Sequence, residues 1–157
     1  MFSLISLQKF LNKADKPHAD GTATIIREDD GSNSIRFRDG MWSMHDNFFG
    51  GEPYGGRQIV YYNKRPVWFC AYYGRVEDRV AVKPVYDFLR RSLQQAPVNG
   101  FSRGPAKFSE GEFTYHNTAI GSLENFSGHE TIDQSGQEVY SADYMGGLVD
   151  QRSQGGY

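Results

Sequence analysis

The stretch FRDGMWSMHDNFFG, residues 37–50, is informative about the fold because a similar stretch, FSEGEFTYHNTAIG, occurs at residues 108–121. Glycine, an aromatic residue, histidine and a final glycine stand at matching positions in the two stretches. With one residue inserted in the second stretch, the match continues into the segments that follow. Self-similarity over a long spacing indicates one structural unit that occurs twice. The sequence therefore predicts an internal duplication, with repeats at about residues 3–76 and 84–148.

Each predicted repeat consists of a helix followed by short strands. Ser3 is a suitable N-cap for a helix that is expected to end near residues 15–17, and Pro84 favours the start of a second helix that Pro97 ends. Runs of β-branched and aromatic residues between turn residues predict strands. These runs are residues 22–27, 34–38, 41–46, 57–62, 67–73, 106–109, 112–117, 129–133 and 138–145. The predicted fold class is α+β: two helix-plus-antiparallel-meander repeats form a curved antiparallel sheet with both helices packed on it.

Length and composition favour one sheet-rich domain. The chain has 157 residues, within the usual size of a single domain, which we assign to residues 1–150. Residues 151–157 have little to anchor them and are expected to fray. Aromatic residues make up 15% of the chain and there are 18 glycines, a combination typical of strands joined by tight turns. Glycines common to both repeats, such as Gly56 and Gly74, are expected at turns or bulges.

Charge and cysteine content narrow the function classes. The formal net charge of -2 provides no concentrated basic field, so we expect no direct nucleic-acid binding. No run approaches the roughly 18 apolar residues of a membrane-spanning helix, and the N-terminus lacks the pattern of a secretory signal. A single cysteine, Cys70, excludes an internal disulfide and suits a reducing compartment. We therefore expect a cytoplasmic protein without membrane contact.

Alternation along the strands assigns side chains to faces of the sheet. Trp68, Cys70 and Tyr72 share one face, which we predict to be the core face, so the Cys70 thiol is expected to be buried and unreactive. Gln58 and Glu130 have the same parity as apolar neighbours. Because buried polar groups need partners, we expect a hydrogen-bond network at these two positions, made with Tyr side chains, Arg side chains or a ligand.

The loop GGEPYGG, residues 50–56, is the first candidate functional region. It lacks the lysine and the following helix of a phosphate-binding loop, so a pair of bends between strands is the simpler interpretation. Gly51, Glu52 and Gly55 have no counterpart in the second repeat, which suggests a role specific to the first. The predicted ligand-binding residues are these three together with neighbouring aromatic and basic side chains: Phe48, Phe49, Tyr54, Arg57 and Tyr73.

A noncatalytic binding module is the leading functional hypothesis. Two repeats form a cleft between them, and such junctions are common binding sites for a small molecule or a protein partner. An enzyme of the small-molecule hydrolase type is an alternative, with His45 or Glu52 as general base and Arg57 holding an anion. A self-associating structural protein, such as a homodimer, is a further alternative. We expect no cofactor and no metal, because no three metal-ligating residues share one face of a strand.

The segment HDNFFGGEPYGGRQIVYYNKRPVWFCAYYGRV, residues 45–76, contains an aromatic-Gly-Gly turn, a further aromatic and glycine, then Pro-Val-Trp and an aromatic-Gly end. In this pattern it resembles the bacterial domain-of-unknown-function family numbered 5680, and residues 145–148 are similar to the closing segment of that family. The matching residues are Phe49, Gly50, Gly51, Tyr54, Gly56, Pro66, Val67, Trp68, Tyr72, Tyr73 and Gly74. Ala71 departs from the usual Asn. The resemblance implies a small prokaryotic, cytoplasmic domain that is sometimes appended to a helix-turn-helix module, and it implies no activity.

Overall fold

The computed structural model describes residues 1–152, so most of the tail that was predicted to fray, residues 153–157, lies outside the described range. The two helices are α1 (Leu4–Ala19) and α2 (Val82–Leu93). The strands are β1 (Ile26–Arg27), β2 (Asn33–Asp39), β3 (Trp42–Phe49), β4 (Tyr54–Tyr62), β5 (Arg65–Val76), β6 (Lys107–Glu110), β7 (Phe113–Ser122), β8 (Asn125–Gln134) and β9 (Gln137–Leu148).

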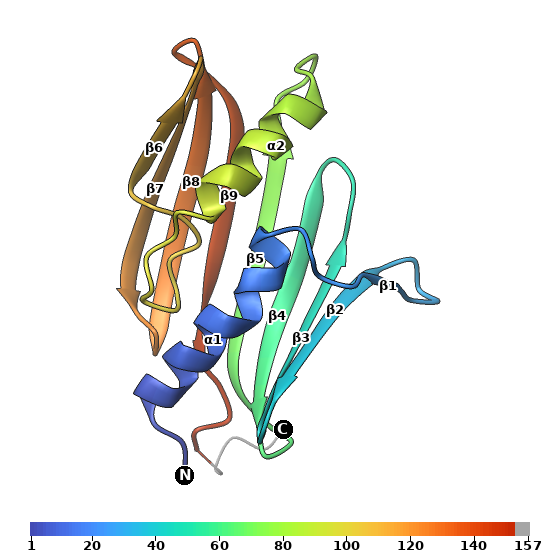
Figure 1. Ribbon diagram of the computed structural model, residues 1–157, viewed down its shortest axis with the longest axis vertical. Coiled ribbons are helices and arrows are strands. Elements are labelled where there is room, and N and C mark those ends of the chain that lie inside the picture. The colour runs from blue at the N-terminus through green and yellow to red at the C-terminus, as the bar shows by residue number, and fades with distance from the viewer. Residues whose placement is uncertain (153–157) are drawn as a thin grey trace.

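The nine strands form one open antiparallel sheet, and both helices lie on the same face of it (Figure 1). The strand order is β1-β2-β3-β4-β5-β9-β8-β7-β6. Strands that follow each other in sequence are therefore neighbours, except that β5 pairs with β9 in the middle of the sheet. The α+β class and the antiparallel sheet agree with the sequence prediction.

Helix α1 begins where predicted but ends later. The Ser3 hydroxyl accepts a hydrogen bond at 3.1 Å from a backbone N–H of the first turn. The helix then runs through Pro17, whereas the sequence predicted an end near residues 15–17. A proline in the last turn removes only one hydrogen bond of the helix. The Pro17 carbonyl accepts hydrogen bonds from the N–H groups of Thr22 and Ala23, which return the chain to the end of α1.

Helix α2 starts earlier than predicted, at Val82, so Pro84 occupies its third position rather than its first. The N–H groups of a first helical turn have no partner within the helix, so proline is tolerated at either position. Val85, Phe88 and Leu89 are buried, at the helical spacing of a single stripe that faces the sheet.

Each predicted strand run corresponds to a strand, and most strands extend beyond the predicted bounds. The exception is the first run, residues 22–27, of which only the last two residues pair with β2. The N–H groups of Thr22 and Ala23 are bound to the Pro17 carbonyl at 2.9 and 3.0 Å, so they are not available to a strand ladder.

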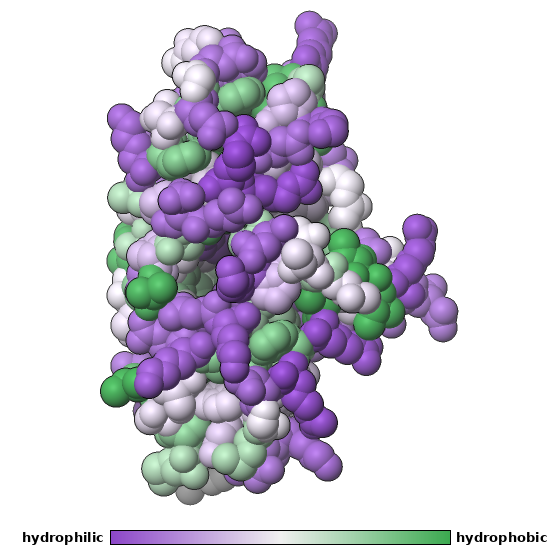
Figure 2. Space-filling view, in the orientation of Figure 1, coloured by the Kyte–Doolittle hydropathy of each residue, from purple (hydrophilic) through white to green (hydrophobic). Residues whose placement is uncertain are grey.

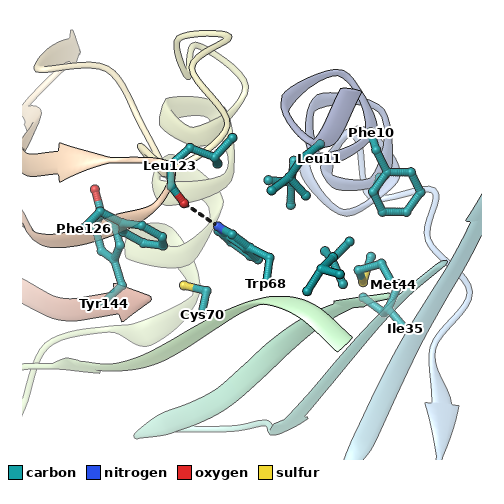
Figure 3. Packing of buried hydrophobic residues seen from close by; sticks show 13 residues of the cluster. Phe10, Leu11, Ile35, Met44, Trp68, Cys70, Leu123, Phe126 and Tyr144 are labelled. Carbon is teal, nitrogen blue, oxygen red and sulfur yellow. Dashed lines mark hydrogen bonds between the residues drawn. The ribbon is translucent and has the colours of Figure 1, made fainter. Parts of the chain in front are cut away.

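The side chains buried between helices and sheet form two apolar clusters. One cluster joins α1 to the helix-side face of β2 to β5 and also includes Leu123, Phe126 and Tyr144 (Figure 3). Within it, the Trp68 indole N–H donates to the Leu123 carbonyl at 3.0 Å. The other cluster joins α2 to β7, β8 and β9 around the fully buried Phe88. Burial of each large side chain contributes about 1.5–3 kcal/mol. Trp68 and Cys70 are both buried here, so the predicted core face of β5 is confirmed.

The surface that carries the helices is mainly hydrophilic, with an apolar group over β1 where Ile25 and Ile26 are exposed (Figure 2). Among residues 1–152, neither helix is both long and apolar enough to cross a membrane.

Candidate functional site

Between the two apolar clusters, the helix-side face of the central strands is polar. We call this region the polar seam and define it by the following residues. The strands contribute Asp46, Tyr54, Gln58, Tyr72, Asn117, Glu130 and Tyr144, α1 contributes Asp15, and the loop between α2 and β6 contributes Arg103. Polar groups inside an apolar layer destabilise a fold unless they are partnered, so their concentration here needs a physical explanation.

Glycines make room for the tyrosines of the seam. Each of three tyrosines lies opposite a glycine of the neighbouring strand, in the pairs Tyr54–Gly74, Tyr72–Gly56 and Tyr144–Gly128. A Cβ added to Gly74 would lie 2.6 Å from the Tyr54 hydroxyl, which leaves no space for any side chain. Gly56 and Gly74 are therefore inside regular strands, and the expectation that they mark turns or bulges was wrong. The facing ring, rather than the backbone conformation, requires glycine at these positions.

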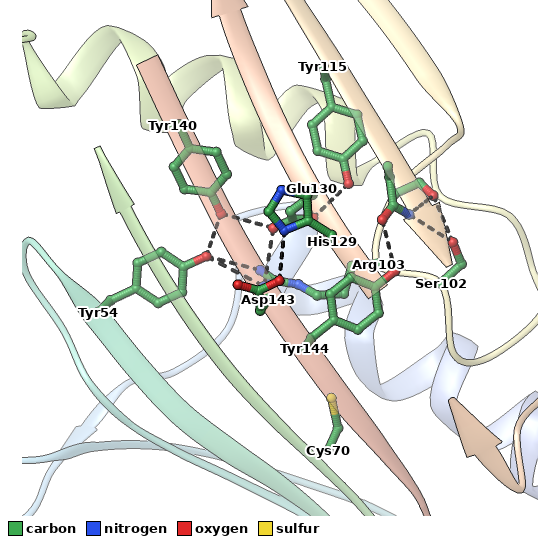
Figure 4. A network of polar contacts seen from close by, with 12 residues as sticks. Tyr54, Cys70, Ser102, Arg103, Tyr115, His129, Glu130, Tyr140, Asp143 and Tyr144 are labelled. Carbon is green, nitrogen blue, oxygen red and sulfur yellow. Dashed lines mark hydrogen bonds and ion pairs between the residues drawn. The ribbon is translucent and has the colours of Figure 1, made fainter. Parts of the chain in front are cut away.

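Glu130 is the centre of one half of the seam (Figure 4). It is fully buried, and its carboxylate accepts hydrogen bonds from Tyr115 at 2.7 Å and from Tyr140 at 2.9 Å. The Arg103 guanidinium lies 3.2 Å from the same carboxylate. Glu130 thus has a cation and two hydroxyl donors, and the predicted network of Tyr and Arg partners at this position is confirmed.

Arg103 connects the two halves of the seam. Its guanidinium lies over the ring of Tyr72 at 5.4 Å from the centroid and over that of Tyr144 at 5.9 Å, and it contacts the Tyr54 hydroxyl at 3.5 Å. Burial lowers the pKa of Arg103, but Glu130, Tyr54 and Tyr140 together outweigh burial, so the pKa lies well above its ordinary value. Arg103 is therefore a permanently charged cation held inside the seam.

The amide of Asn117 completes this half. Tyr144 donates a hydrogen bond to Asn117 Oδ1 at 2.9 Å. Asn117 Nδ2 donates to the Ser102 hydroxyl at 3.0 Å and to the Gly104 carbonyl at 3.1 Å. Both polar atoms of the amide are therefore partnered within the protein.

Asp46 has the same relation to Tyr72 that Asn117 has to Tyr144. The Tyr72 hydroxyl donates to Asp46 Oδ1, but no residue of the described chain donates to Asp46 Oδ2. Burial raises the pKa of Asp46 to about 6, while the hydrogen bond from Tyr72 acts in the opposite direction. This half of the seam therefore holds a carboxylate with less support than Glu130 has.

Asp15 joins the seam from the last turns of α1. Gln58 Nε2 donates to Asp15 Oδ1 at 2.6 Å, and Gln58 is the direct cross-strand partner of Asp46, so the two carboxylates are close together. Burial raises the pKa of Asp15 to about 6, and Asp46 contributes in the same direction. The residue as a whole is exposed to solvent. The Asp15 carboxylate thus contacts Gln58 on one side and is reached by water on another.

The Cys70 thiol and the His129–Asp143 pair lie near the polar seam but are not part of its hydrogen-bond network. The Cys70 thiol is buried, as predicted, and burial raises its pKa to about 12, so it stays protonated at neutral pH. His129 and Asp143, which overlap the network in Figure 4, form a 2.7 Å contact between exposed side chains. They lie on the opposite face, because His129 precedes Glu130 in the same strand.

The three predicted catalytic residues do not meet. Glu52 lies in the turn between β3 and β4, where it accepts hydrogen bonds from the Tyr86 hydroxyl and, at 2.6 Å, from a backbone N–H of β5. His45 and Arg57 point to the other face of the sheet, since each alternates with a residue of the seam. Burial and nearby arginines, Arg57 among them, lower the pKa of His45. Gly51 lies in the same turn as Glu52, with a φ of 119°.

The other predicted ligand-binding residues are divided between the two faces. Phe48 packs against the first apolar cluster and Tyr54 belongs to the polar seam, both on the helix side. Phe49 and Tyr73 lie on the opposite face and are 57% and 56% exposed. Gly55 is inside β4, paired with Tyr73. Of these predicted residues, only Tyr54 is part of the seam.

Sequence reasoning missed most of the residues that the seam brings together. Arg103 lies in a segment without periodicity, so no sequence pattern indicated which way its side chain points. Asp46 directly follows His45, the predicted general base, but its side chain lies on the other face of the sheet. A usable signal was present, because Asp46 aligns with Asn117 in the two matching stretches. An acid in one stretch aligned with an amide in the other marks a position where the halves differ in charge.

The seam offers carboxylates, an amide, phenols and one guanidinium as binding groups. Across the part of the chain that the structure describes, no three His, Cys, Asp or Glu side chains are arranged to hold a metal ion. Direct polar and aromatic contacts to an organic molecule are therefore the chemistry that these groups suit best.

Comparison with known proteins places the chain in a family. The family model described as Domain of unknown function (DUF5680) matches residues 46–149. The matched range begins at Asp46 and includes every residue of the polar seam except Asp15. No curated protein and no solved structure matches the chain. Because the match covers more than half of the sequence, the chain belongs to the DUF5680 family.

Proposed function

We propose that this domain is a noncatalytic binding module that holds a small molecule at the polar seam. The observation that carries the proposal is the state of Asp46, which is only 8% exposed and yet has a hydrogen-bond donor on one oxygen alone. A carboxylate in this position destabilises the folded protein when it is ionised. A ligand that donates a hydrogen bond to the second carboxylate oxygen explains why an acidic residue stands at this position. Packing within the protein does not explain it.

Binding fits the chemistry of the seam better than catalysis does. The burial of Tyr72 and the charge of Asp46 raise the Tyr72 pKa, so its hydroxyl remains a hydrogen-bond donor rather than a base. The Cys70 thiol is likewise held in its protonated form. The hydrolase alternative required His45, Glu52 and Arg57 to line one pocket, and their side chains are distributed over two faces of the sheet.

The binding site in this proposal lies at the junction of two copies of one unit. Tyr72 and Tyr144, which are equivalent in the sequence alignment, are direct cross-strand partners. On either side of them, Cys70 pairs with Gly146, and Gly74 pairs with Ala142. A twofold axis through the tyrosine pair exchanges these two pairs, as the alignment of Cys70 with Ala142 and Gly74 with Gly146 requires. The Tyr72 hydroxyl donates to Asp46 and the Tyr144 hydroxyl donates to Asn117. Because Asp46 and Asn117 are also aligned, these two hydrogen bonds support the same twofold relation.

The uncovered face of the sheet favours self-association as a second function. Phe49, Tyr73 and Met145 are exposed on that face, at 57%, 56% and 63%. Contiguous exposed apolar side chains are typical of protein contacts. Sedimentation of the full chain over a range of concentrations tests this function, and a monomer at all concentrations contradicts it. The buried free thiol of Cys70 is the basis for proposing a cytoplasmic location.

A thermal-shift screen against a metabolite library tests the binding function. A ligand at about one hundred times its Kd adds about 2.7 kcal/mol to the apparent stability. Hits are compared across the wild-type protein, the seam variants Tyr72→Phe and Gln58→Leu, and the matched variant Tyr73→Phe on the opposite face. We expect hits that stabilise the wild type and Tyr73→Phe more than the seam variants. A library without hits, or hits that stabilise all four proteins equally, contradicts the proposal.

A further inference from the structure

The carboxylates in the two halves of the polar seam have different partners. Glu130 is paired with the Arg103 guanidinium at 3.2 Å and accepts two tyrosine hydroxyls. Asp46 accepts the Tyr72 hydroxyl, and no cationic side chain within residues 1–152 lies at ion-pair distance from it. One half therefore contains its cation as part of the protein, and the other half contains a carboxylate without one.

One oxygen of Asp46 faces accessible space. The residue is more than nine-tenths buried, and Tyr72 occupies only Oδ1. Every fully enclosed side-chain nitrogen or oxygen in the described chain has a hydrogen-bond partner. Since Oδ2 has none, it is not fully enclosed. A nearly buried carboxylate oxygen that lacks a donor and borders open space is a position for a donor from outside the protein.

The Asp15 carboxylate, on the helix side, lies close enough to Asp46 for the two charges to interact. Gln58 binds Asp15 Oδ1 at 2.6 Å and holds it beside Asp46. Asp15 also lies near the end of α1, where the helix dipole is negative and favours a cation. Two carboxylates and a helix C-terminus thus produce a negative potential at this point.

We propose that the polar seam binds its small molecule through a protonated amine, with the ammonium group between the carboxylates of Asp15 and Asp46. This inference rests on the binding function proposed above. An ammonium group can donate a charge-assisted hydrogen bond to each carboxylate, and such bonds are stronger than neutral ones. The seam already holds a cation in Arg103, which pairs with Glu130 and lies over two tyrosine rings. A phosphate or carboxylate ligand would instead meet two like charges.

The surrounding groups make amine binding depend on pH. The titratable and charged groups that face this point are Asp15 and His18 of α1, Asp46 of β3, Cys70 and Tyr72 of β5, Glu130 of β8 and Arg103. Burial and Arg103 lower the pKa of His18, so it is neutral at neutral pH, and Cys70 and Tyr72 are protonated. Asp15 and Asp46 are then the groups that change charge near pH 6. Affinity for an amine should rise with pH across that region.

Matched amine and alcohol probes test the proposal. Benzylamine, phenethylamine and tyramine are each compared with the alcohol of the same shape, by NMR titration of the full chain to about 10 mM, well above the Kd expected of a good fragment. We expect each bound amine to be at least about tenfold tighter than its alcohol. Asp46→Asn and Asp15→Asn should each weaken amine binding about tenfold and remove its rise with pH. The control Asp143→Asn, an exposed carboxylate on the opposite face, should have no effect.

The outcomes separate this inference from the function on which it rests. Alcohols that bind as well as amines, amine affinity unchanged in Asp46→Asn, or no binding by any amine contradicts the ammonium site. If the metabolite screen still yields neutral or anionic ligands whose effect is lost in Tyr72→Phe, the seam remains a binding site for another chemical class. If no ligand of any charge depends on the seam, the proposed function fails as well. Asp46→Asn retains the acceptor for Tyr72, as Asn117 does for Tyr144, so it is expected to fold.

Discussion

The ring of Tyr144 lies directly against the backbone of its cross-strand partner Gly128, because a Cβ on Gly128 would lie 2.0 Å from Tyr144 Cζ. The ring cannot easily move away, since it is buried and its hydroxyl is bound to Asn117 at 2.9 Å. Two similar pairs, Tyr54–Gly74 and Tyr72–Gly56, lie in the first half of the sheet. Bulky rings thus lie flat on the central strands and present their hydroxyls to the polar seam.

Replacing Gly128 with alanine should therefore destabilise the protein strongly. We predict that Gly128→Ala lowers the free energy of unfolding by about 2–3 kcal/mol, since the added methyl group overlaps a ring that has no free space. Urea unfolding followed by circular dichroism measures this change. The matched control is Gly55→Ala in β4, whose Cβ would lie 3.3 Å from the Tyr73 ring, an exposed side chain that can move. Equal midpoints for the two variants would contradict the proposed role of the ring.

Asp46 should reduce stability at neutral pH. Burial raises its pKa to about 6 in the folded protein, above the ordinary value of 3.8, so the folded state binds a proton that the unfolded state has lost between these values. Stability therefore falls as pH rises from about 4 to about 6 and stays low above that range. Asp46→Asn should be about 2–3 kcal/mol more stable than the wild type near pH 8 and nearly equal to it near pH 4.

Urea unfolding at these two pH values measures the effect of Asp46. Asp143→Asn, at an exposed position, serves as the control and should leave the pH profile unchanged. If Asp46→Asn is less stable than the wild type near pH 8, the carboxylate is a stabilising partner within the fold. Asp46 would then need no donor from a ligand.

The sequence was sufficient to predict the features that depend on local pattern. The cap at Ser3, the alternation that buries Trp68 and Cys70, and the need of Glu130 for Tyr or Arg partners all follow from residues close in the chain. The seam depends on long-range placement. Arg103 comes from an irregular loop, and Asp15 meets Gln58 across 43 positions of sequence. Such contacts leave no periodic signal, because nothing near either residue specifies its partner.

The ion pair between Arg103 and Glu130 should be strongly coupled. Arg103→Met leaves a fully buried carboxylate without its cation, which should lower the free energy of unfolding by about 3–5 kcal/mol. Glu130→Gln should have a smaller effect, because the Arg103 side chain is 20% exposed and can be solvated in part. The double variant should be at least about 1–2 kcal/mol more stable than the sum of the single effects predicts. A double-mutant cycle by urea unfolding measures this coupling, and additive effects would mean that the pair acts as two independent groups.

The Cys70 thiol reports on whether the seam opens without global unfolding. It is buried on the core face beside Gln58, and burial raises its pKa to about 12. In the native protein near pH 8, its thiolate fraction should be about a thousandfold below that of a free thiol. We predict that reaction with Ellman's reagent is at least about a hundredfold slower in the native protein than in the unfolded chain. Its rate should increase with urea as global unfolding does. A fast native rate that is insensitive to low urea would instead show local opening between the helices and the sheet, which would give a ligand a route to Asp46.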